Sequence, residues 1–242
     1  MVAVADRPVV EYVDSWRLTP EQLQRLYDEV LNPSFPVDEL VPRRRLLPRL
    51  AAEGSGVCCR VAIDPAGRVL AGIVADLYPA SRVLLLSYLA VLSGLRDRGI
   101  GSGLALDAVP RWIARYEPAL AVAEVEDPRF HAGSNALKHG DADARMRLYD
   151  SLGGLILPLP YVQPALRDGK RVRNLLLMAF HASPEVCHGG RLDSELVVRF
   201  LTEYFTVCEG KTPDDVEFTG LIDASKRPDG IPLVKPSEFL SS

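Results

Sequence analysis

The strongest constraint on the fold is a nearly continuous apolar run from Arg82 to Val91, followed by a glycine-rich turn and a helical pattern. Such runs belong in the middle of a sheet with both faces covered, since a solvated face would show as polar alternation. We expect the helix to extend from about Gly99 to Tyr116, with Pro110 kinking or restarting it because proline lacks an N–H. A central strand therefore leads through a short turn into a helix.

Further strand and helix signals alternate along the chain. Thr19 and Pro20 are typical of an N-cap and a first helical residue, so a helix should begin there and continue to about Leu31. The turn from Asp64 to Gly67 predicts a hairpin of the segments on either side. Together these signals indicate a mixed α/β fold with helices on both faces of a sheet. The other expected strands are 9–13, 57–63, 69–77, 120–126 and 175–180, and the other expected helices are 43–52, a short one ending at Gly153 and Gly154, and 192–208.

Composition excludes several classes of protein. The chain has 242 residues, of which 48% are hydrophobic and 25% charged, so it can bury a sizeable core. Its net charge is −4 and no basic stripe is present, which argues against nucleic acid as a partner. The N-terminus lacks the pattern of a signal peptide, and no apolar run is long enough to cross a bilayer. We therefore expect a cytoplasmic protein with no membrane partner.

The cysteines do not indicate a metal centre or a disulfide framework. The four are Cys58, Cys59, Cys187 and Cys208, and none forms a C-x-x-C motif. Cys187 and His188 form a pair without further spaced ligands. We expect all four cysteines to be small, buried apolar residues and expect no bound metal.

The turn after the apolar run has the features of an anion site. In the segment from Arg96 to Gly101, glycines stand three and five positions after the arginine, at the start of the expected helix. Glycines let a ligand approach the backbone, and the unpaired amides of a first helical turn point towards it. A pyrophosphate could be held there, with Arg96 or Arg98 adding charge. A simple strand-to-helix turn is the alternative, whereas a dinucleotide fingerprint fits less well because Leu104 replaces its third glycine.

The same segment resembles the acyl-CoA signature of the GNAT acyltransferases, R/Q-x-x-G-x-G/A. In that family the signature follows a strand often ending Tyr-Leu-Ala-Val, as Tyr88 to Val91 does here. A second match is Arg145 to Gly154, which is similar to the family's later helix, where a tyrosine precedes a Leu-Gly turn and a strand. The resemblance implies a central, mostly antiparallel mixed sheet of about six or seven strands.

The resemblance also implies how the cosubstrate is bound. The strands 82–91 and 120–126 would splay apart so that pantetheine adds as a pseudo-strand, and the glycine-rich turn would hold the pyrophosphate. No metal is implied. The implied contacts with acetyl-CoA or coenzyme A are made by Leu89, Ala90, Val91, Arg96, Arg98, Gly99, Ile100, Gly101 and Ser102.

Acyl transfer to an amine requires two proton movements, which indicate an acid and a base. The resemblance implies that Tyr149 is the general acid, whereas by residue pattern alone a tyrosine near leucines is more often part of a half-buried core. Glu124 and Glu126 alternate with apolar residues on one strand, so both carboxylates should share a face and either is a candidate base. The alternative is a solvated strand end in which they pair with Arg129 or Arg147. Weaker candidates are Ser87 and Tyr88.

Two segments are candidates for the acceptor pocket. The loop 127–141 is long for a compact domain, and loops of this length are usually functional or mobile. The stretch 157–166 is expected to form another wall of the pocket, with rigid loop packing as the alternative. Polar residues of the first loop that could contact an acceptor are Arg129, His131, Asn135, Lys138 and His139.

The resulting prediction is an N-acetyltransferase that moves an acetyl or other acyl group from acyl-CoA to a primary amine of a small molecule, by direct attack in a ternary complex. The alternatives are a protein or peptide N-acetyltransferase, a non-catalytic acyl-CoA-binding module and a structural interaction protein. We expect an acyltransferase domain over residues 1–182 and a C-terminal helical extension over 183–242. The apolar stripe of helix 192–208 should dock on its own domain or on a second subunit, which makes a homodimer possible.

Overall fold

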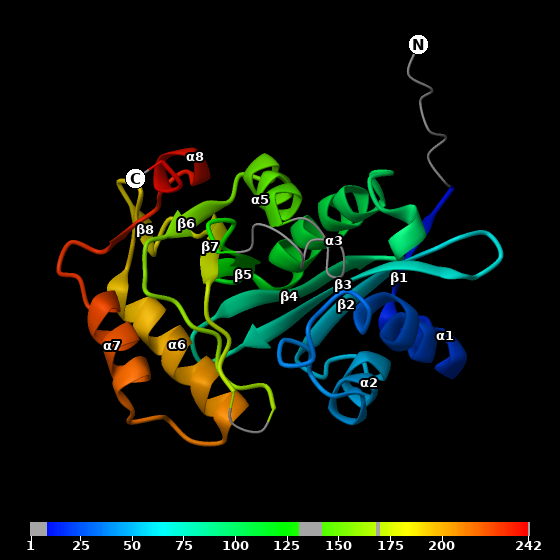
Figure 1. Cartoon of the computed structure of the whole chain (residues 1–242), viewed down its shortest axis with the longest axis horizontal. Helices are drawn as coiled ribbons and strands as arrows, with labels where there is room; N and C mark the ends of the chain where they lie inside the picture. The colour runs from blue at the N-terminus through cyan, green and yellow to red at the C-terminus, as the bar shows by residue number, and fades with distance from the viewer. Residues whose placement is uncertain (1–8, 131–141, 168–169, 242) are drawn as a thin grey trace, which may run out of the picture. The chain divides into compact units, whose positions relative to one another are not determined.

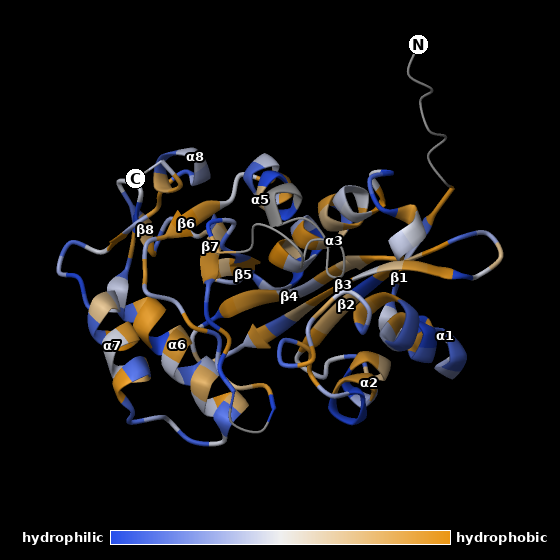
Figure 2. Cartoon of the chain, viewed as in Figure 1, coloured by the Kyte–Doolittle hydropathy of each residue, from blue (hydrophilic) through white to orange (hydrophobic). Residues whose placement is uncertain are grey.

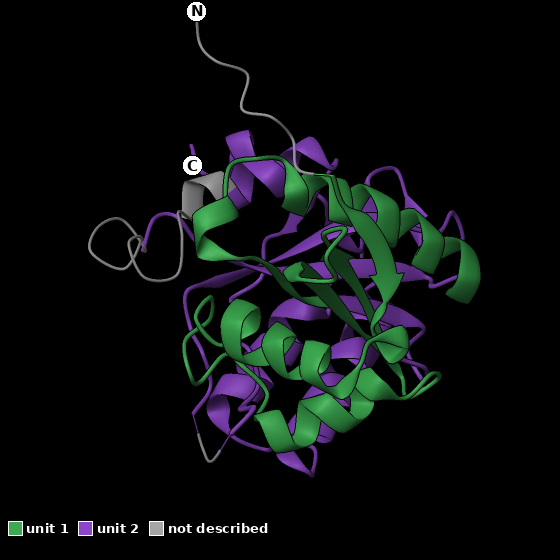
Figure 3. Ribbon diagram, turned by 90° about the vertical axis from the view of Figure 1, so that its right-hand side faces the viewer, with its two compact units in different colours: residues 1–76, 86–116 green, residues 77–85, 117–242 purple. Residues whose placement is uncertain are grey.

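The computed structural model describes residues 9–130, 142–167 and 170–241. The chain forms two compact units, coloured separately in Figure 3. Unit 1 comprises Met1–Asp76 and Leu86–Tyr116, and unit 2 comprises Leu77–Leu85 and Glu117–Ser242. Each unit is therefore discontinuous in sequence.

The main sheet has seven strands, and all but β6 overlap strand ranges that the sequence predicts (Figure 1). They are β1 (Glu11–Asp14), β2 (Val57–Ile63), β3 (Val69–Tyr78), β4 (Val83–Val91), β5 (Leu120–Glu126), β6 (Leu155–Leu157) and β7 (Leu175–Ala182). Their order in the sheet is β1-β2-β3-β4-β5-β7-β6. The sheet is mostly antiparallel, as expected, and β4 and β5 are parallel. The apolar run that forms β4 occupies the middle position.

The helices also begin close to their sequence signals. Thr19 caps α1, because its side chain accepts from the Gln22 amide while the Gln22 side chain accepts from the Thr19 amide. Pro110 lies inside α3 without interrupting it, so the expected restart was wrong. The carbonyl that proline leaves unpaired is that of Leu106, whose side chain is exposed, so water can reach this side of the helix. The helices are η1 (Ser15–Arg17), α1 (Pro20–Arg25), η2 (Leu26–Leu31), α2 (Arg43–Ala51), η3 (Ser93–Leu95), α3 (Ile100–Tyr116), α5 (Ala142–Ser151), α6 (Ser194–Glu209), α7 (Val216–Ser225) and α8 (Pro236–Phe239).

In unit 1, strand β2 separates two layers. Cys59 and Val61 belong to an apolar cluster with residues of α1, η2 and α2. Arg60, between them, faces the other way and binds Asp107 of α3 and Asp14 of β1. This alternation places α1 and α2 on one face and α3 on the other. Figure 2 shows the strands in largely apolar colours and the outer surface of α1 in hydrophilic ones.

In unit 2, helices α6 and α7 cover one face of the strands. Leu120 and Val122 of β5 share an apolar cluster with Phe200 and Phe205 of α6 and Phe218 of α7. Helix α5 lies on the opposite side of β5 from α6 (Figure 1). The apolar stripe of α6 therefore packs within its own chain, and residues 183–242 belong to the same compact unit as β5 and β7.

The segment after α6 contains more structure than the expected tail. Besides α7 and α8 it contributes β10 (Ile231–Pro232), which pairs with β9 (Arg191–Leu192), and β9 pairs with β8 (Cys187–His188). Val234 also bridges to Ile156 of β6. The C-terminal segment thus adds backbone hydrogen bonds to β6 of the seven-stranded sheet and completes a second, three-stranded sheet in the order β10-β9-β8.

Candidate functional site

The opening of α3 in unit 1 has the geometry of an anion site. Asp97 and Gly99 adopt left-handed φ angles of 61° and 74°. The first backbone hydrogen bond of the helix runs from Gly103 N to Gly99 O at 3.0 Å. The amides that precede Gly103 in this turn therefore have no carbonyl acceptor within the helix. Because α3 has 17 residues, its dipole adds positive potential at the same place.

Glycine is required in this turn by space as well as by conformation. A Cβ at Gly101 would lie 3.1 Å from Val91 Cγ2, and one at Gly103 would lie 2.4 Å from the Tyr12 hydroxyl oxygen. The first turn of α3 is therefore packed against the end of β4 and against β1. A Cβ at Gly94, by contrast, would meet no atom within 4 Å.

Two arginines flank this turn. Arg96 is half-buried, and its Nη2 lies 3.4 Å from Ser34 Oγ, whereas Arg98 is exposed. Within the described ranges, neither arginine forms an ion pair with a carboxylate. Their charges are consequently not neutralised by a neighbouring acid, which suits the binding of a phosphate group.

The end of β4 alternates between buried and half-buried side chains. Ala90 and Tyr88 are buried, whereas Leu89 and Val91 are half-buried. The Tyr88 hydroxyl accepts from Val41 N at 3.0 Å. On the same strand, Ser87 Oγ donates to Asp76 at 2.7 Å. Ser87 and Tyr88, the weaker candidates for the base, therefore already form hydrogen bonds within unit 1.

In unit 2, Tyr149 projects from the last turn of α5. Its side chain is buried, and burial raises the pKa of its phenol to about 12 although the nearby Arg145 opposes this shift. Among the described residues, none is a hydrogen-bond partner of its hydroxyl. Its carbonyl accepts from Gly154 N at 2.9 Å, in the turn after the helix. A Cβ at Gly154 would come within 2.8 Å of that carbonyl oxygen, which explains the second glycine of the pair.

Glu124 lies on the α6 side of β5 and is held by three neutral donors. Its Oε1 accepts from the Tyr161 hydroxyl and from the Tyr204 hydroxyl, the latter at 3.0 Å. Its Oε2 accepts from Gln163 Nε2 at 2.6 Å. All three donor residues are buried, whereas Glu124 is half-buried. Burial, reinforced by the charge of Glu124, raises the pKa of both tyrosines well above the usual value.

Glu126 has a charged partner instead. Its carboxylate forms an ion pair with Arg145 of α5, and both side chains are largely buried. Arg129, which the sequence offered as a partner for this strand end, binds Asp127 with an Nη2–Oδ2 distance of 2.7 Å. Glu124 and Glu126 thus have different partners: neutral donors contact Glu124 on the α6 side, and the Arg145 guanidinium of α5 pairs with Glu126 at the end of the strand.

The three donors to Glu124 had no assigned role at the sequence level. Tyr161 and Gln163 fall in the stretch expected to form a pocket wall, and Tyr204 lies in the apolar stripe of α6. A signal was present in the residue types, because a tyrosine or glutamine in an apolar setting needs a hydrogen-bond partner. Their separations from Glu124, at 37, 39 and 80 residues, gave no local clue to which partner that is.

Unit 2 contains a cavity of about 550 Å³ between the end of β5, the start of β7 and α7. Tyr161 and Val162 line it, so the stretch 157–166 does contribute to a cavity wall. Arg129 and Phe130 line it from the loop after β5, while residues 131–141, including His131, Asn135, Lys138 and His139, lie outside the described residues. The Arg129 guanidinium stacks on the ring of Phe239, 4.6 Å from its centroid.

The four cysteines form no disulfide. Cys58 and Cys59 are buried as expected, whereas Cys187 and Cys208 are only half-buried. Burial raises the pKa of the Cys58 thiol to about 11 and that of Cys59 to about 12, so both stay protonated at neutral pH. Across the part of the chain that the structure describes, no group of three or more His, Cys, Asp or Glu side chains is placed to hold a metal ion. In the same residues, no helix combines the length and apolarity needed to cross a membrane.

Comparison with known proteins places the fold. No family model and no curated protein matches the sequence. Among solved structures, a GNAT-family protein of Bacteroides thetaiotaomicron superposes with a TM-score of 0.54 at 18% identity, over 81% of this chain and 98% of that one. NAA60 of Arabidopsis thaliana, solved in complex with a bisubstrate analogue, gives a TM-score of 0.51 at 15% identity, over 71% of this chain and 97% of that one.

The chain therefore has the fold of the GNAT acetyltransferases. At identities of 15–18%, the likeness shows the fold alone.

Proposed function

We propose that the protein is an acyl-CoA-dependent N-acyltransferase that transfers an acetyl or related acyl group to a primary amine of a small molecule by direct attack in a ternary complex. The opening of α3 is the observation that carries this proposal. It combines amides without a carbonyl acceptor in the helix, left-handed Gly99, close packing at Gly101 and two arginines that form no ion pair with an acid among the described residues. These are the donors that a diphosphate requires. When bound, acyl-CoA supplies an activated thioester carbonyl.

Tyr149 suits the role of general acid. A phenol with a pKa of about 12 keeps its proton at neutral pH and can donate it to a departing thiolate. Its hydroxyl has no competing hydrogen-bond partner among the described residues. The role assigned to Tyr149 from the family resemblance thus agrees with the local chemistry of its environment.

Of the two candidate bases, we favour Glu124. The cation beside Glu126 stabilises its charged form and makes its carboxylate a weaker proton acceptor. Tyr204 and Gln163 donate neutral hydrogen bonds to Glu124, which stabilise its charged form less than a guanidinium would, and half-burial partly offsets even these bonds. Glu124 and Tyr149 also approach β5 from its two faces. In a direct attack the amine adds to the thioester carbonyl and loses a proton to Glu124, and the tetrahedral intermediate then expels the thiolate, which takes a proton from Tyr149.

The cosubstrate assignment is tested by placing a methyl group in the cradle. We expect Gly101→Ala to lower the affinity for coenzyme A at least about tenfold, because the methyl group crowds the first turn of α3 beside Val91. Alanine favours a helix over glycine by about 1 kcal/mol, so weaker binding would not come from a weaker helix. Isothermal titration calorimetry with coenzyme A measures the affinity.

The matched control is Gly94→Ala, since a Cβ at Gly94 meets no neighbouring atom. It should bind coenzyme A as the parent protein does. Absence of binding to the parent protein at millimolar coenzyme A would refute the assignment. A panel of small amines and peptides, with release of free thiol as the signal, then identifies the acceptor class.

A further inference from the structure

The segment 158–174, which we term the strap, carries two of the three donors to Glu124. It links β6 to β7, and its described parts are 158–167 and 170–174. Its one pairing in the described parts is an isolated bridge between Gln163 and Val172. Ordering a segment of this length costs conformational entropy of about 1–2 kcal/mol per residue, so it needs other contacts to hold one conformation.

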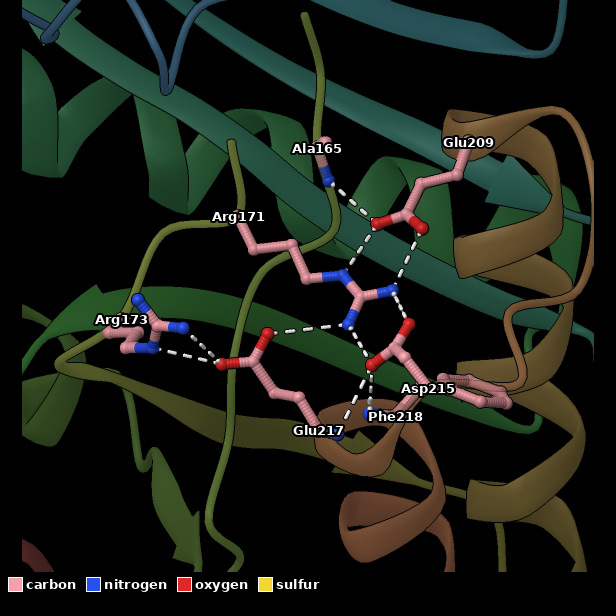
Figure 4. Close-up of polar contacts among 7 residues, drawn as sticks. All are labelled: Ala165, Arg171, Arg173, Glu209, Asp215, Glu217 and Phe218. Atoms are coloured by element: carbon pink, nitrogen blue, oxygen red, sulfur yellow. Dashed lines mark hydrogen bonds and ion pairs between the residues drawn. The ribbon is translucent and has the colours of Figure 1, made fainter. Parts of the chain in front are cut away.

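Arg171 provides the densest set of such contacts (Figure 4). Its guanidinium binds both carboxylate oxygens of Glu209, at 2.7 and 2.9 Å, and both of Asp215, each at 2.7 Å. It also lies 3.3 Å from Glu217 and 5.1 Å from the centroid of the Phe205 ring. The Arg171 and Glu209 side chains are only 13% and 18% exposed, so their ion pair is largely shielded from water, whereas Asp215 binds Arg171 from a half-exposed position.

The acids around Arg171 come from two helices. Glu209 is the last residue of α6, Asp215 is the N-cap of α7, and Glu217 lies in the first turn of α7. Glu209 also accepts from Ala165 N at 3.1 Å, so α6 contacts the strap at two points. The strap is therefore anchored to the helix that provides the third donor to Glu124, Tyr204.

We propose that Arg171 is a positioning residue for the Glu124 carboxylate, fixing the strap on α6 so that Tyr161, Gln163 and Tyr204 converge on it. This inference rests on the proposed function, in which Glu124 is the base. Arg171 does not contact Glu124 in this arrangement and acts through the backbone on which the donors stand. The fixed carboxylate would accept the proton of the amine in a constant orientation.

The chemistry of Gln163 makes the position of the strap critical. Because a carboxylate only accepts, the amide nitrogen of Gln163 must face Glu124. The amide oxygen then faces away and is buried without a hydrogen-bond partner among the described residues. An unpaired buried acceptor disfavours this arrangement by about 1–3 kcal/mol. The Gln163 side chain should therefore move away from Glu124 when the strap is not anchored.

The test compares Arg171→Met with Arg173→Met. Met keeps much of the apolar stem but removes the guanidinium. Arg173 lies on the same strap, but its side chain is 72% exposed and pairs only with Glu217 among the ion pairs described. We expect Arg171→Met to lower kcat about 10²-fold. Loss of donors to the charged Glu124 carboxylate should also raise its pKa. The acidic limb of the kcat/KM profile should therefore move to a pH about one unit higher. Arg173→Met should leave both unchanged.

Further measurements distinguish a loss of positioning by Arg171 from a folding defect and from failure of the proposed function. Arg171→Lys should recover only part of the loss, because an ammonium cannot replace two bidentate contacts. Coenzyme A affinity should stay unchanged in all these variants, since its proposed cradle belongs to unit 1. An unchanged pH profile in folded Arg171→Met protein would overturn the inference. If Arg171→Met does not fold, Glu209→Gln provides a milder change with the same expected direction.

If the parent protein turns over no amine, the proposed function fails, but positioning can still be measured. Ultraviolet absorbance titration counts tyrosines that ionise near the usual value. We expect Arg171→Met to expose additional titrating tyrosines, because Tyr161 and Tyr204 lose their shielded contact with Glu124. The same tyrosine count in Arg171→Met and Arg173→Met would contradict a role for Arg171 in holding this cluster.

Discussion

At the level of single residues, proton transfer depends on what surrounds each group rather than on its type. Tyr149 lies in an apolar environment that keeps its phenol protonated. Glu124 and Glu126 are two positions apart on one strand, yet one is held by neutral hydroxyl and amide groups and the other by a guanidinium. Different neighbours can therefore assign different roles to two identical side chains.

This difference predicts the outcome of three conservative substitutions. Tyr149→Phe and Glu124→Gln should each lower kcat by about 10²- to 10⁴-fold, because each removes a group that moves a proton. Glu126→Gln should lower kcat less, since its carboxylate is already paired with the Arg145 guanidinium. Thiol release at saturating acyl-CoA measures the rates. Equal losses in the Glu124 and Glu126 variants would show that the base has been misassigned.

At the level of secondary-structure elements, local signals predicted most of the fold. The Thr19 cap, the turn at Gly67 and the apolar β4 all depend on neighbouring residues, so their elements appear where expected. Helix α7 was missed although Asp215 caps it and Phe218, Leu221 and Ile222 follow at helical spacing, because Gly220 weakens that pattern.

The candidate site was less predictable than the fold. The cradle at Gly99 and Gly101 lies in one short segment, and so its pattern was visible in the sequence. The partners of Glu124 come from the strap and from α6, and the anchor at Arg171 joins residues that are 38 to 46 positions apart. Such pairings depend on tertiary packing, which periodicity cannot reveal.

The anchor between the strap, α6 and α7 also predicts how stability depends on pH. Arg171 lowers the pKa of Asp215 and of Glu209 below their usual values. The stabilisation is fully present above the unfolded pKa values, about 4, and is lost as pH falls through the lower folded values. Urea unfolding between neutral and acidic pH should therefore show a steady loss of stability on acidification.

Asp215→Asn separates the charge from the helix cap. Asparagine still caps a helix well, so α7 should keep its N-terminus while one ion pair to Arg171 is lost. We expect a lower free energy of unfolding at neutral pH and a smaller decrease of this free energy on acidification. Asp214→Asn, at the exposed neighbouring position, should behave like the parent protein. A slope unchanged in Asp215→Asn would show that this contact does not contribute to acid sensitivity.

At the level of the whole molecule, residues 183–242 complete the core of unit 2. Helix α6 contributes six buried side chains, three of them aromatic and two of these, Phe200 and Phe205, fully buried. Glu203 on the same helix accepts from Ser81 N at 2.8 Å. The expected boundary at residue 182 would therefore cut through a compact unit.

A chain ending at Ala182 should not fold cooperatively. Removing even one buried phenylalanine side chain typically costs about 3–5 kcal/mol, and this truncation removes several large apolar residues. Circular dichroism during thermal unfolding should show a broad or absent transition and low soluble yield. A chain ending at Lys235, which lacks only α8 and the residues after it, should unfold like the full chain. A sharp transition in the shorter chain would contradict this view of the core.

The separation between Ser81 and Glu203 has a consequence for biosynthesis. The two residues lie 122 positions apart, so on the ribosome the turn after β3 emerges long before the helix that covers it. At about 5–20 residues per second, that interval lasts roughly 6–24 s. During it the apolar residues of β4 and β5 in unit 2 lack α6. The nascent chain should then depend on chaperones until translation has passed α6.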